Sequence, residues 1–387
     1  MCANPGSPSV PTRPCYTMYL RPGSVSAAGP QRAGDRFHSN VVEHRRAVAS
    51  RLKQGRHAMA GLIDIHAHHY PDSYLAACRR ADSGYTSYVR DDGRLVVLQD
   101  GAVALAAPQP MPSTAARLSA MDAAGVDVQV ISVSAPNVYR FPDSWRSGLT
   151  RDINDEIGET CASSGGRLLE FASLPLPDVS AALAELDRIA DRAVGVMITT
   201  TIAGRTLDDE LFAPLLAEFS RRGTVVFVHP GVASSTEHIR EYALALALDY
   251  LAETTNCIAR LVYSGTFDAH PGIRWIFSHL GGTTPFLIHR FDNYYQQFPE
   301  CRERVSRAPS EVLRGVYFDT VTTHRPALQC ALDTFDPGQL LFGTDYPHVP
   351  GGLDRFTATL HAMDIRPESM QAIERTTAAS LLGIGAR

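Results

Sequence analysis

The sequence predicts a (β/α)₈ barrel, and two observations support this fold class. From residue 60 onward, short apolar runs alternate with longer amphipathic segments. The runs are almost continuously hydrophobic, which is typical of parallel strands that are buried on both faces. Eight such runs occur within roughly 320 residues, a length that suits this barrel. A doubly wound open sheet is the alternative, but no run is followed by the glycine-rich phosphate fingerprint of that class.

The eight expected strands are each five to seven residues long and rich in Val, Ile, Leu and Phe. They are residues 62–66, 127–133, 168–174, 194–200, 224–230, 273–279, 316–321 and 340–345. Amphipathic helices are expected between them, for example at residues 114–125, 178–193 and 209–223. The last of these segments ends at Gly223, and glycine commonly ends helices because it adopts left-handed backbone angles without steric cost.

One connection is too long for a simple strand-to-helix loop. Residues 70–112 separate the first strand from the next helix, and residues 87–105 within them have the pattern of a β-hairpin. Asp92-Gly93 is its expected turn, because Asp-Gly favours two-residue hairpin turns. Since the insertion follows the first strand, we expect it on the face where a barrel carries its active site, as part of a pocket wall.

The chain is expected to have two parts. Residues 1–58 are rich in Pro, Gly, Ser and Arg and contain nine Lys and Arg against two acidic residues, so their charge is +7. This composition predicts a disordered extension, with an organelle transit peptide as the alternative. Residues 59–387 form the expected barrel, and because the whole chain has a charge of −5, this part has a charge of −12.

Composition excludes several classes of partner. The acidic body argues against nucleic acid as a ligand. No apolar run approaches the ~20 residues of a membrane span, so no membrane association is expected. The seven cysteines are dispersed without a C-x-x-C pair, which indicates free thiols in a reducing compartment. We therefore expect a cytoplasmic protein.

Polar residues stand at the ends of several expected strands. His66 and His68 are two positions apart after the first strand, so their side chains point to the same side. His229, His279 and Asp345 end three further strands. Each of these residues alone is more often structural. Together they predict a metal site, because a barrel gathers all carboxyl ends of its strands at one face and because imidazole and carboxylate suit Zn²⁺ and similar ions.

Four motifs, in this order along the chain, resemble a known group. They read IDIHAHHYP, VFVHPG, FSHLGGTTPF and FGTDYPH, and the similarity extends over residues 61–384. The sequence resembles the amidohydrolase superfamily, in particular the branch of aminocarboxymuconate semialdehyde, salicylate-type and resorcylate decarboxylases. The resemblance implies metal ligands and an acid–base histidine beside the metal-bound water. The implied ligands are His66, His68, His229 and Asp345, and the implied acid–base residue is His279.

Further residues are candidates for contacts with a small carboxylate substrate. The resemblance implies that Arg290 reaches the site of a neighbouring subunit, and therefore a homodimer. His348 and His324 follow the last two strands and are expected to line the pocket. Tyr139 and Arg140 follow the second strand and are weaker candidates of the same kind.

Two features refine the expected site. The segment at 194–203 contains no Lys, so no carboxylated lysine is available to bridge two metals, and one divalent ion is expected. Zn²⁺ is the first choice and Mn²⁺ the second. Residues 95–116 contain no Arg, although the resembling semialdehyde decarboxylase has a substrate-binding arginine in this insertion. This difference favours a substrate with one carboxylate and a more apolar ring, such as a methylsalicylate.

The expected activity is metal-dependent, non-oxidative decarboxylation of a hydroxybenzoate, methylsalicylate-like or muconate-type acid. His279 and Asp345 are the candidate proton carriers. The alternative is a hydrolase or hydratase that cuts a lactone, amide or C–C bond with hydroxide generated on the metal. A barrel retained only as an interaction scaffold is a third possibility, which an intact set of ligands disfavours.

Overall fold

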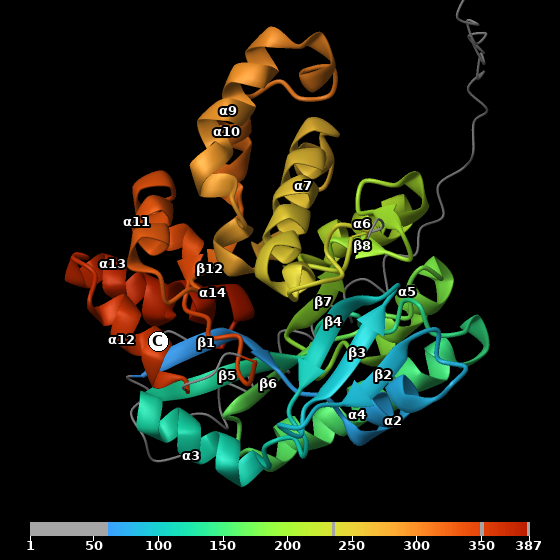
Figure 1. Ribbon diagram of the computed structural model, residues 1–387. Coiled ribbons are helices and arrows are strands. Elements are labelled where there is room, and N and C mark those ends of the chain that lie inside the picture. Colours follow the sequence, from blue (N-terminus) through green and yellow to red (C-terminus); the bar gives the residue numbers. More distant parts are fainter. Residues whose placement is uncertain (1–60, 234–236, 349–351, 385–387) are drawn as a thin grey trace, which may run out of the picture.

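The computed structural model describes residues 61–233, 237–348 and 352–384, and Figure 1 shows a barrel surrounded by helices. Residues 1–58, the expected disordered extension, lie outside the described residues. The eight expected strands are confirmed as one parallel sheet. In spatial order they are β1 (Leu62–His68), β5 (Val126–Ser132), β6 (Leu168–Ala172), β7 (Gly195–Thr199), β10 (Val225–His229), β11 (Arg274–Phe277), β12 (Tyr317–Asp319) and β13 (Leu340–Leu341).

The sheet closes between its first and last strands. The backbone N–H of Ile65 donates to the carbonyl oxygen of Phe342 at 2.9 Å, and the N–H of His68 donates to the carbonyl oxygen of Tyr346 at 2.7 Å. Ala67 and Tyr346 form a parallel bridge at the same seam. A closed parallel sheet is a (β/α)₈ barrel, so the open doubly wound alternative is wrong.

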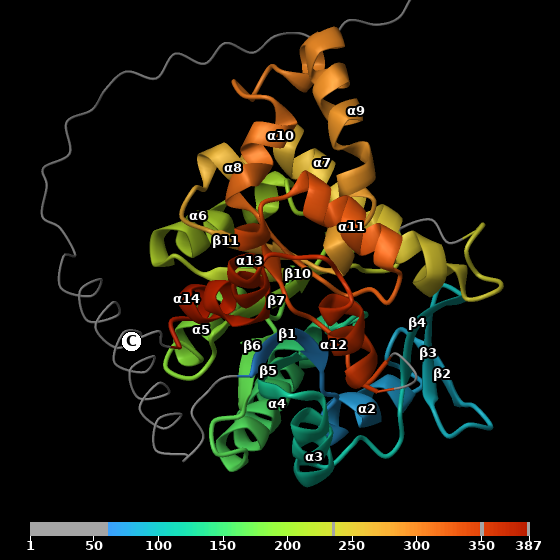
Figure 2. The same ribbon diagram turned by 90° about the vertical axis from the view of Figure 1, so that its left-hand side faces the viewer.

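Helices cover the outside of the barrel, as Figure 2 shows from a second direction. They are α2 (Asp72–Arg79), α3 (Thr114–Ala124), α4 (Asp143–Ser163), α5 (Val179–Arg188), α6 (Ala213–Arg222), α7 (Tyr250–Tyr263), α8 (Thr266–Ala269), α9 (Thr284–Gln297), α10 (Pro309–Val312), α11 (Arg325–Thr334), α12 (Asp354–His361), α13 (Pro367–Gln371) and α14 (Thr377–Leu382). The expected stop at Gly223 is confirmed, because this glycine follows α6 with a left-handed φ of 64°. Among the described residues, no helix has the length and apolar character to cross a membrane.

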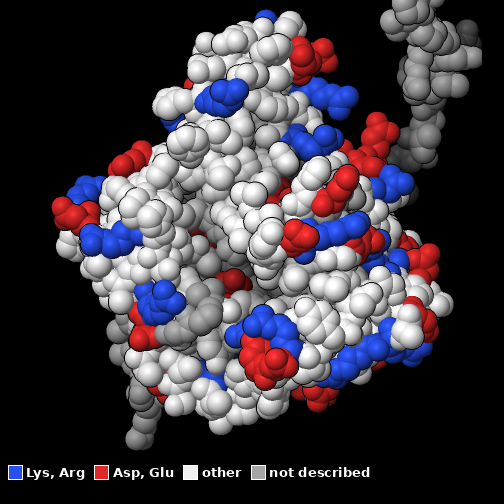
Figure 3. Space-filling view, viewed as in Figure 1, with Lys and Arg blue, Asp and Glu red and all other residues white. Residues whose placement is uncertain are grey.

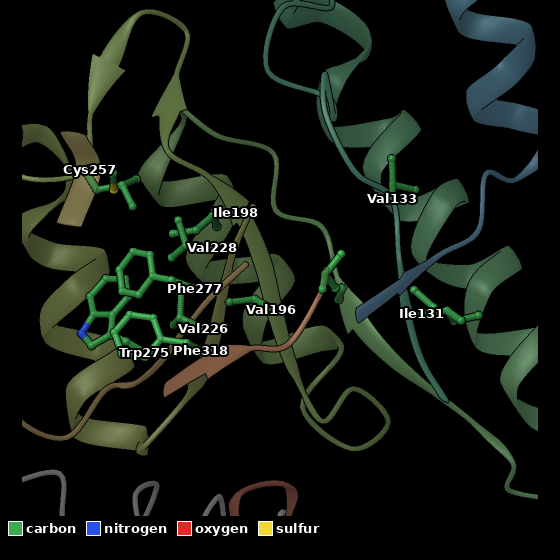
Figure 4. Packing of buried hydrophobic residues seen from close by; sticks show 14 of the residues in the cluster. Ile131, Val133, Val196, Ile198, Val226, Val228, Cys257, Trp275, Phe277 and Phe318 are labelled. Atoms are coloured by element: carbon green, nitrogen blue, oxygen red, sulfur yellow. The ribbon is translucent and has the colours of Figure 1, made fainter. Parts of the chain in front are cut away.

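The strands have two buried faces, as their continuous hydrophobicity predicts. Along β10, Val226 and Val228 point outward and pack with Trp275, Phe277 and Phe318 under the helices (Figure 4). The alternate residues Val225 and Phe227 belong to a second cluster that fills the barrel interior with Ile63, Ile65, Val128, Phe171 and Ile276. Because side chains alternate along a strand, His229 points to the interior side as well.

The insertion after β1 is larger than the expected hairpin. It forms three antiparallel strands, β2 (Thr86–Val89), β3 (Leu95–Gln99) and β4 (Ala102–Ala107). The first turn contains Asp92-Gly93 as expected, with a φ of 81° at Gly93. A second turn at Asp100-Gly101, where φ is 51° and 84°, adds the third strand. A second, smaller hairpin follows β7 and consists of β8 (Thr201–Ile202) and β9 (Arg205–Thr206).

Helix α9 and the segment after it project from the barrel. Both views show the far end of this arm extending beyond the helices that α9 packs against, among them α10 and α11 (Figures 1 and 2). Two large apolar side chains on it are exposed, Phe286 at 81% and Phe298 at 40%. The arm also carries Arg290, for which the family resemblance predicts a contact with a neighbouring subunit.

Candidate metal centre

A bulge in β1 turns two histidines toward the barrel interior. The pairing of β1 with β5 shifts register between Asp64 and Ala67. Ile65 faces the interior, and the next residue, His66, does so too, because its ring lies 4.9 Å from the ring of interior Phe227. A β-bulge allows two successive side chains to share one face. His68, two residues further on, then follows His66 to the same side.

Four side chains converge at this end of the barrel. The ligand atoms of His66, His68, His229 and Asp345 all lie within 4.8 Å of one another. Nε2 of His66 lies 2.9 Å from Nε2 of His68, and Oδ1 of Asp345 lies 3.0 Å from that same His68 atom. The three histidines are buried and the Asp345 side chain is 16% exposed. The ends of β1 and β10 and the turn after β13 thus contribute to one cluster.

The hydrogen bonds of the three histidines fix which nitrogen faces the cluster. In His66 and His229 Nδ1 contacts an oxygen that only accepts, so Nδ1 carries the hydrogen and the lone pair of the neutral ring is on Nε2. Nδ1 of His68 lies 3.3 Å from both the carbonyl oxygen and the hydroxyl of Ser132, and donation to the carbonyl gives the same form. The three contacts are His66 Nδ1 to Asp319 Oδ2 at 2.6 Å, His68 Nδ1 to the Ser132 carbonyl at 3.3 Å and His229 Nδ1 to the Pro230 carbonyl at 2.9 Å. Oδ1 of Asp345 accepts no hydrogen bond among the described residues. Electron pairs that face one another in a buried site repel unless a cation lies between them, so the set fits a divalent ion.

Three of the four groups are held in the protonation state that a metal ion requires, and His66 is the exception. Burial lowers the pKa of His68 to about 3 and holds that of His229 well below its ordinary value. Burial raises the pKa of Asp345, but the neighbouring histidines, His279 first, outweigh it and hold this pKa well below its usual range. Burial lowers the pKa of His66, but the Asp319 carboxylate outweighs burial and raises it to about 10. Metal binding at Nε2 of His66 would therefore displace a proton.

His279 lies beside the cluster without joining it. Its Nε2 is 3.7 Å from Oδ2 of Asp345, and its Nδ1 has no hydrogen-bond partner in the described part of the chain. Both residues have left-handed backbones, with φ of 53° at His279 and 58° at Asp345. For residues other than glycine this conformation costs on the order of 1–3 kcal/mol, and it persists where surrounding structure enforces it, often at functional sites.

A cavity of about 410 Å³ opens next to the cluster. Its floor includes His229, His279 and Asp345, and its walls include Ser134, Tyr250 and Leu246. The insertion contributes a wall, as the sequence predicts, through β4 and the residues before β3. Figure 3, in the view of Figure 1, shows a hollow near the middle of the molecule. Basic and acidic side chains lie together at its rim. The volume suits a ligand with a single aromatic ring.

The structure brings one of the expected substrate-contact residues to the cavity. His348 lines it, and Nε2 of His348 lies 2.5 Å from the Tyr70 hydroxyl, which lies 2.5 Å from Oγ of Ser134. His324 is exposed before α11 and is absent from the described cavity wall. Arg290 is exposed on α9, where its guanidinium lies 4.9 Å from the centre of the Tyr294 ring.

Tyr139 and Arg140 lie elsewhere. They line a second cavity, of about 430 Å³, and neither is part of the described wall of the cavity at the metal cluster. Arg140 forms an ion pair with Asp100, in the second turn of the insertion, at 2.5 Å. This turn leads into β4, the third strand of the insertion, which was not predicted from the sequence. The unexpected position of Arg140 follows from its contact with this turn.

Sequence reasoning missed several residues of the site. Asp319, which holds His66, is the last residue of β12, so the argument from strand ends would have found it. Arg94 lines the cavity from the position just before β3, one residue ahead of the segment 95–116, which contains no arginine. No sequence pattern pointed to Tyr70 or Tyr250. Tyr70 contacts His348 and Tyr250 lines the cavity only because the insertion and α7 fold over the barrel.

Comparisons with known proteins agree with this barrel. The amidohydrolase family model matches residues 63–384, and the chain belongs to this family. It is 30% identical over 327 residues to 6-methylsalicylic acid decarboxylase from Penicillium expansum, covering 82% of this chain and 95% of that protein.

Solved structures share the fold. The apo form of Metarhizium anisopliae IDCase superimposes with a TM-score of 0.74 at 24% identity, covering 84% of this chain and 97% of that one. A dihydroxybenzoic acid decarboxylase from Polaromonas sp. JS666, with bound manganese and the inhibitor 2-nitroresorcinol, gives a TM-score of 0.68 at 21% identity, covering 83% and 96%.

Proposed function

We propose that this protein is a metal-dependent, non-oxidative decarboxylase of a small aromatic hydroxy acid, of the hydroxybenzoate or methylsalicylate type. The observation that carries the proposal is the convergence of three Nε2 atoms and one carboxylate beside a cavity of single-ring size. The relative from Penicillium expansum, whose name gives 6-methylsalicylic acid as its substrate, supports the reaction class.

His66, His68, His229 and Asp345 would hold one divalent ion. Zn²⁺ is our first choice for three imidazoles and a carboxylate, and Mn²⁺ is the second, which the manganese in the Polaromonas structure makes worth testing. When bound, such an ion acts as a Lewis acid that orients and polarises an acidic substrate group. Elemental analysis of the purified protein identifies the ion and its stoichiometry.

His279 and Asp345 would carry the proton. Decarboxylation of an aromatic acid requires a proton at the ring carbon that bears the carboxylate. The new C–H bond interrupts the aromatic system, and the C–C bond then breaks so that its electron pair restores the ring and CO₂ leaves. Nε2 of His279 and Oδ2 of Asp345 lie 3.7 Å apart beside the cavity, so this pair can hold and deliver the proton.

Other cavity residues would orient the ring. Leu105, Leu246 and Leu251 provide apolar surface, and Tyr250 is held in place because its hydroxyl donates to the Ala104 carbonyl at 2.6 Å. His348, held by its contact with Tyr70, would hydrogen-bond a polar substituent of the substrate. An apolar ring that fills this cavity would displace water from the reacting carbon, which would favour loss of CO₂ over hydrolysis.

We propose further that the protein acts as a homodimer in the cytoplasm. The exposed Phe286 and Arg290 on the projecting helix α9 support subunit contact, and Arg290 would reach the partner's cavity. Five free cysteines among the described residues fit a reducing compartment. Sedimentation of the active enzyme tests the dimer, and an active species that is strictly monomeric would refute the role of Arg290.

The activity is tested with a panel of acids. The metal-loaded protein is incubated with hydroxybenzoates, 6-methylsalicylate and a muconate semialdehyde, and released CO₂ is measured. We expect CO₂ and the decarboxylated ring from at least one hydroxybenzoate. If no acid loses CO₂ while lactones or amides are opened, the hydrolase alternative replaces this proposal.

A further inference from the structure

Three buried polar side chains form a chain of hydrogen bonds beside the metal cluster. Asp64, Gln129 and Arg117 come from β1, β5 and α3, and each is at most 1% exposed. Nε2 of Gln129 donates to Oδ2 of Asp64 at 2.8 Å, and Nη1 of Arg117 donates to Oε1 of Gln129 at 2.6 Å. We call these three residues the polar clamp.

The polar clamp carries one negative and one positive charge, at its two ends. The contacts of Arg117 with the described residues are neutral: the amide of Gln129, the carbonyl of His68 and the ring of Tyr346. Asp64 accepts hydrogen bonds from neutral groups. Apolar residues are often at least as stabilising as a buried pair of charges, so stability alone does not account for the polar clamp.

Asp64 joins β1 to the turn that carries Asp345. Its Oδ1 accepts from the backbone N–H groups of His66 and Thr344, both at 3.1 Å, and its Oδ2 accepts from the Thr344 hydroxyl at 2.6 Å. Thr344 immediately precedes Asp345, whose own N–H donates to the carbonyl oxygen of His66 at 2.8 Å. Because the left-handed backbone of Asp345 must be enforced by its surroundings, these bonds are suited to hold it.

Arg117 holds the same two segments from the other end of the polar clamp. Its Nη2 donates to the carbonyl oxygen of His68 at 2.7 Å, and its guanidinium lies over the ring of Tyr346, 4.9 Å from the ring centre. Tyr346 immediately follows Asp345. The polar clamp therefore contacts both neighbours of Asp345 along the chain and a backbone group of each histidine of β1.

We infer that the polar clamp positions the metal ligands, with Asp64 as the positioning residue at its centre. It fixes the two segments that carry His66, His68 and Asp345 relative to each other, so that the ligand atoms are in place before the ion binds. Position 64 requires a side chain that only accepts, because four donors face its two oxygens. The inference concerns metal binding and rests on the proposed function only for its effect on turnover.

The hydrogen-bond pattern specifies how the polar clamp can be broken and restored. Asp64→Asn makes an NH₂ group face the NH₂ group of Gln129, and Gln129→Glu makes two carboxylates face each other. In the double variant Asp64→Asn/Gln129→Glu, the amide at position 64 donates to the carboxylate at position 129, which still accepts from Arg117. The Thr344 hydroxyl can then accept instead of donating, and the total charge is unchanged.

The test measures binding of Co²⁺ to each metal-free protein by competition with a chelator. The visible absorption spectrum of bound Co²⁺ is a second measurement, because it depends on the number and geometry of the ligands, and Tm without metal reports folding. Asp333→Asn, alone and combined with Gln329→Glu, is the matched control. Nε2 of Gln329 donates to Oδ1 of Asp333 at 2.8 Å, which is the same kind of bond on the exposed surface of α11.

We expect Asp64→Asn and Gln129→Glu each to weaken Co²⁺ binding roughly 10–100-fold, the usual loss for groups that orient metal ligands, and to change the spectrum. The double variant should bind within about threefold of the natural protein, since two coupled changes that restore one pattern compensate each other. The Asp333 controls should bind like the natural protein.

Folded single variants with natural affinity and an unchanged spectrum would overturn the inference, because the polar clamp would then be only structural. If a single variant does not fold, the double variant decides. A double variant that does not fold, or that binds Co²⁺ more than tenfold more weakly than the natural protein, would also overturn it.

The two proposals fail separately, because Co²⁺ binding requires no substrate. If the clamp variants lose affinity as expected but no acid releases CO₂, the inference stands and the decarboxylase proposal falls. If acids release CO₂ while the clamp variants bind Co²⁺ like the natural protein, the decarboxylase proposal stands and the inference falls.

Discussion

Nε2 of His279 lies 3.7 Å from Oδ2 of Asp345, while the other oxygen of this carboxylate, Oδ1, lies 3.0 Å from Nε2 of His68. The two oxygens of one side chain thus face two different groups of residues. One oxygen belongs to the metal cluster, and the other lies beside the histidine that we propose as proton carrier. Both residues have left-handed backbones, a costly conformation that the surrounding structure must enforce.

Replacing His279 with Gln should separate catalysis from metal binding. We expect kcat to fall roughly 10²–10⁴-fold, the usual contribution of a general acid–base group, with one metal ion per chain retained. Activity is followed as CO₂ release and metal content by elemental analysis. Activity within twofold of the natural protein would show that His279 carries no proton. Loss of the metal would instead place His279 among the ligands.

Replacing Asp319 with Asn should weaken metal binding through His66. An amide can donate a hydrogen bond to Nδ1, which stabilises the ring form whose lone pair points away from the cluster, whereas the native carboxylate at 2.6 Å only accepts. We expect metal affinity to fall roughly 10–100-fold, as is typical for the groups that orient metal-binding histidines. Competition with a chelator measures the affinity. An unchanged dissociation constant would contradict the assigned orientation of His66.

Arg117 on α3 should stabilise the end of β1. It is fully buried, and Nη2 donates to the carbonyl oxygen of His68 at 2.7 Å while Nη1 donates to Oε1 of Gln129 at 2.6 Å. Arg117→Met leaves both acceptors buried without this donor, so we expect the free energy of unfolding to fall by about 2–4 kcal/mol. Urea denaturation with and without metal measures the change. Arg79→Met, which changes an exposed arginine on α2, is the control and should stay within about 0.5 kcal/mol.

Glu170 in β6 should make stability depend on pH. Burial raises its pKa to about 8, although Arg192, whose Nε lies 3.5 Å from Oε2, lowers it in part. Because the folded pKa is above the unfolded value of 4.5, the favourable contribution of the protonated form is complete below pH 4.5 and is lost as pH rises through 8. Glu170→Gln stays neutral. It should therefore match the natural protein near pH 5 and exceed its stability near pH 9, by roughly 1–4 kcal/mol.

Chemical denaturation of both proteins across this pH range provides the comparison. A stability difference between Glu170→Gln and the natural protein that is the same at pH 5 and pH 9 would mean that Glu170 is ionised throughout.

Much of the fold and the centre of the site could be predicted from the sequence. Hydrophobic runs identified all eight barrel strands, since a parallel strand buried on both faces has a distinctive composition. Closure of the sheet then requires the strand ends to meet, which is why His66, His68, His229 and Asp345 come together.

The rest of the site depends on contacts that periodicity does not encode. The insertion gained a third strand from the Asp100-Gly101 turn, and its packing over the barrel decides that Arg94 reaches the cavity while Arg140 does not. From the sequence, His324 and His348 were equally good candidates for the cavity wall, because each follows one of the last two strands. Only His348 faces the cavity, because the turn after β13 leads back toward β1.

The central claim is tested most directly by following a hydroxybenzoate labelled with ¹³C in its carboxyl group, in D₂O, with the metal-loaded protein and with His229→Ala. We predict that the natural protein releases one labelled CO₂ per product molecule and leaves deuterium on the carbon that lost the carboxylate. His229→Ala should lack both the metal and the activity. Full activity in His229→Ala, or product formed without labelled CO₂, would contradict a metal-dependent decarboxylase.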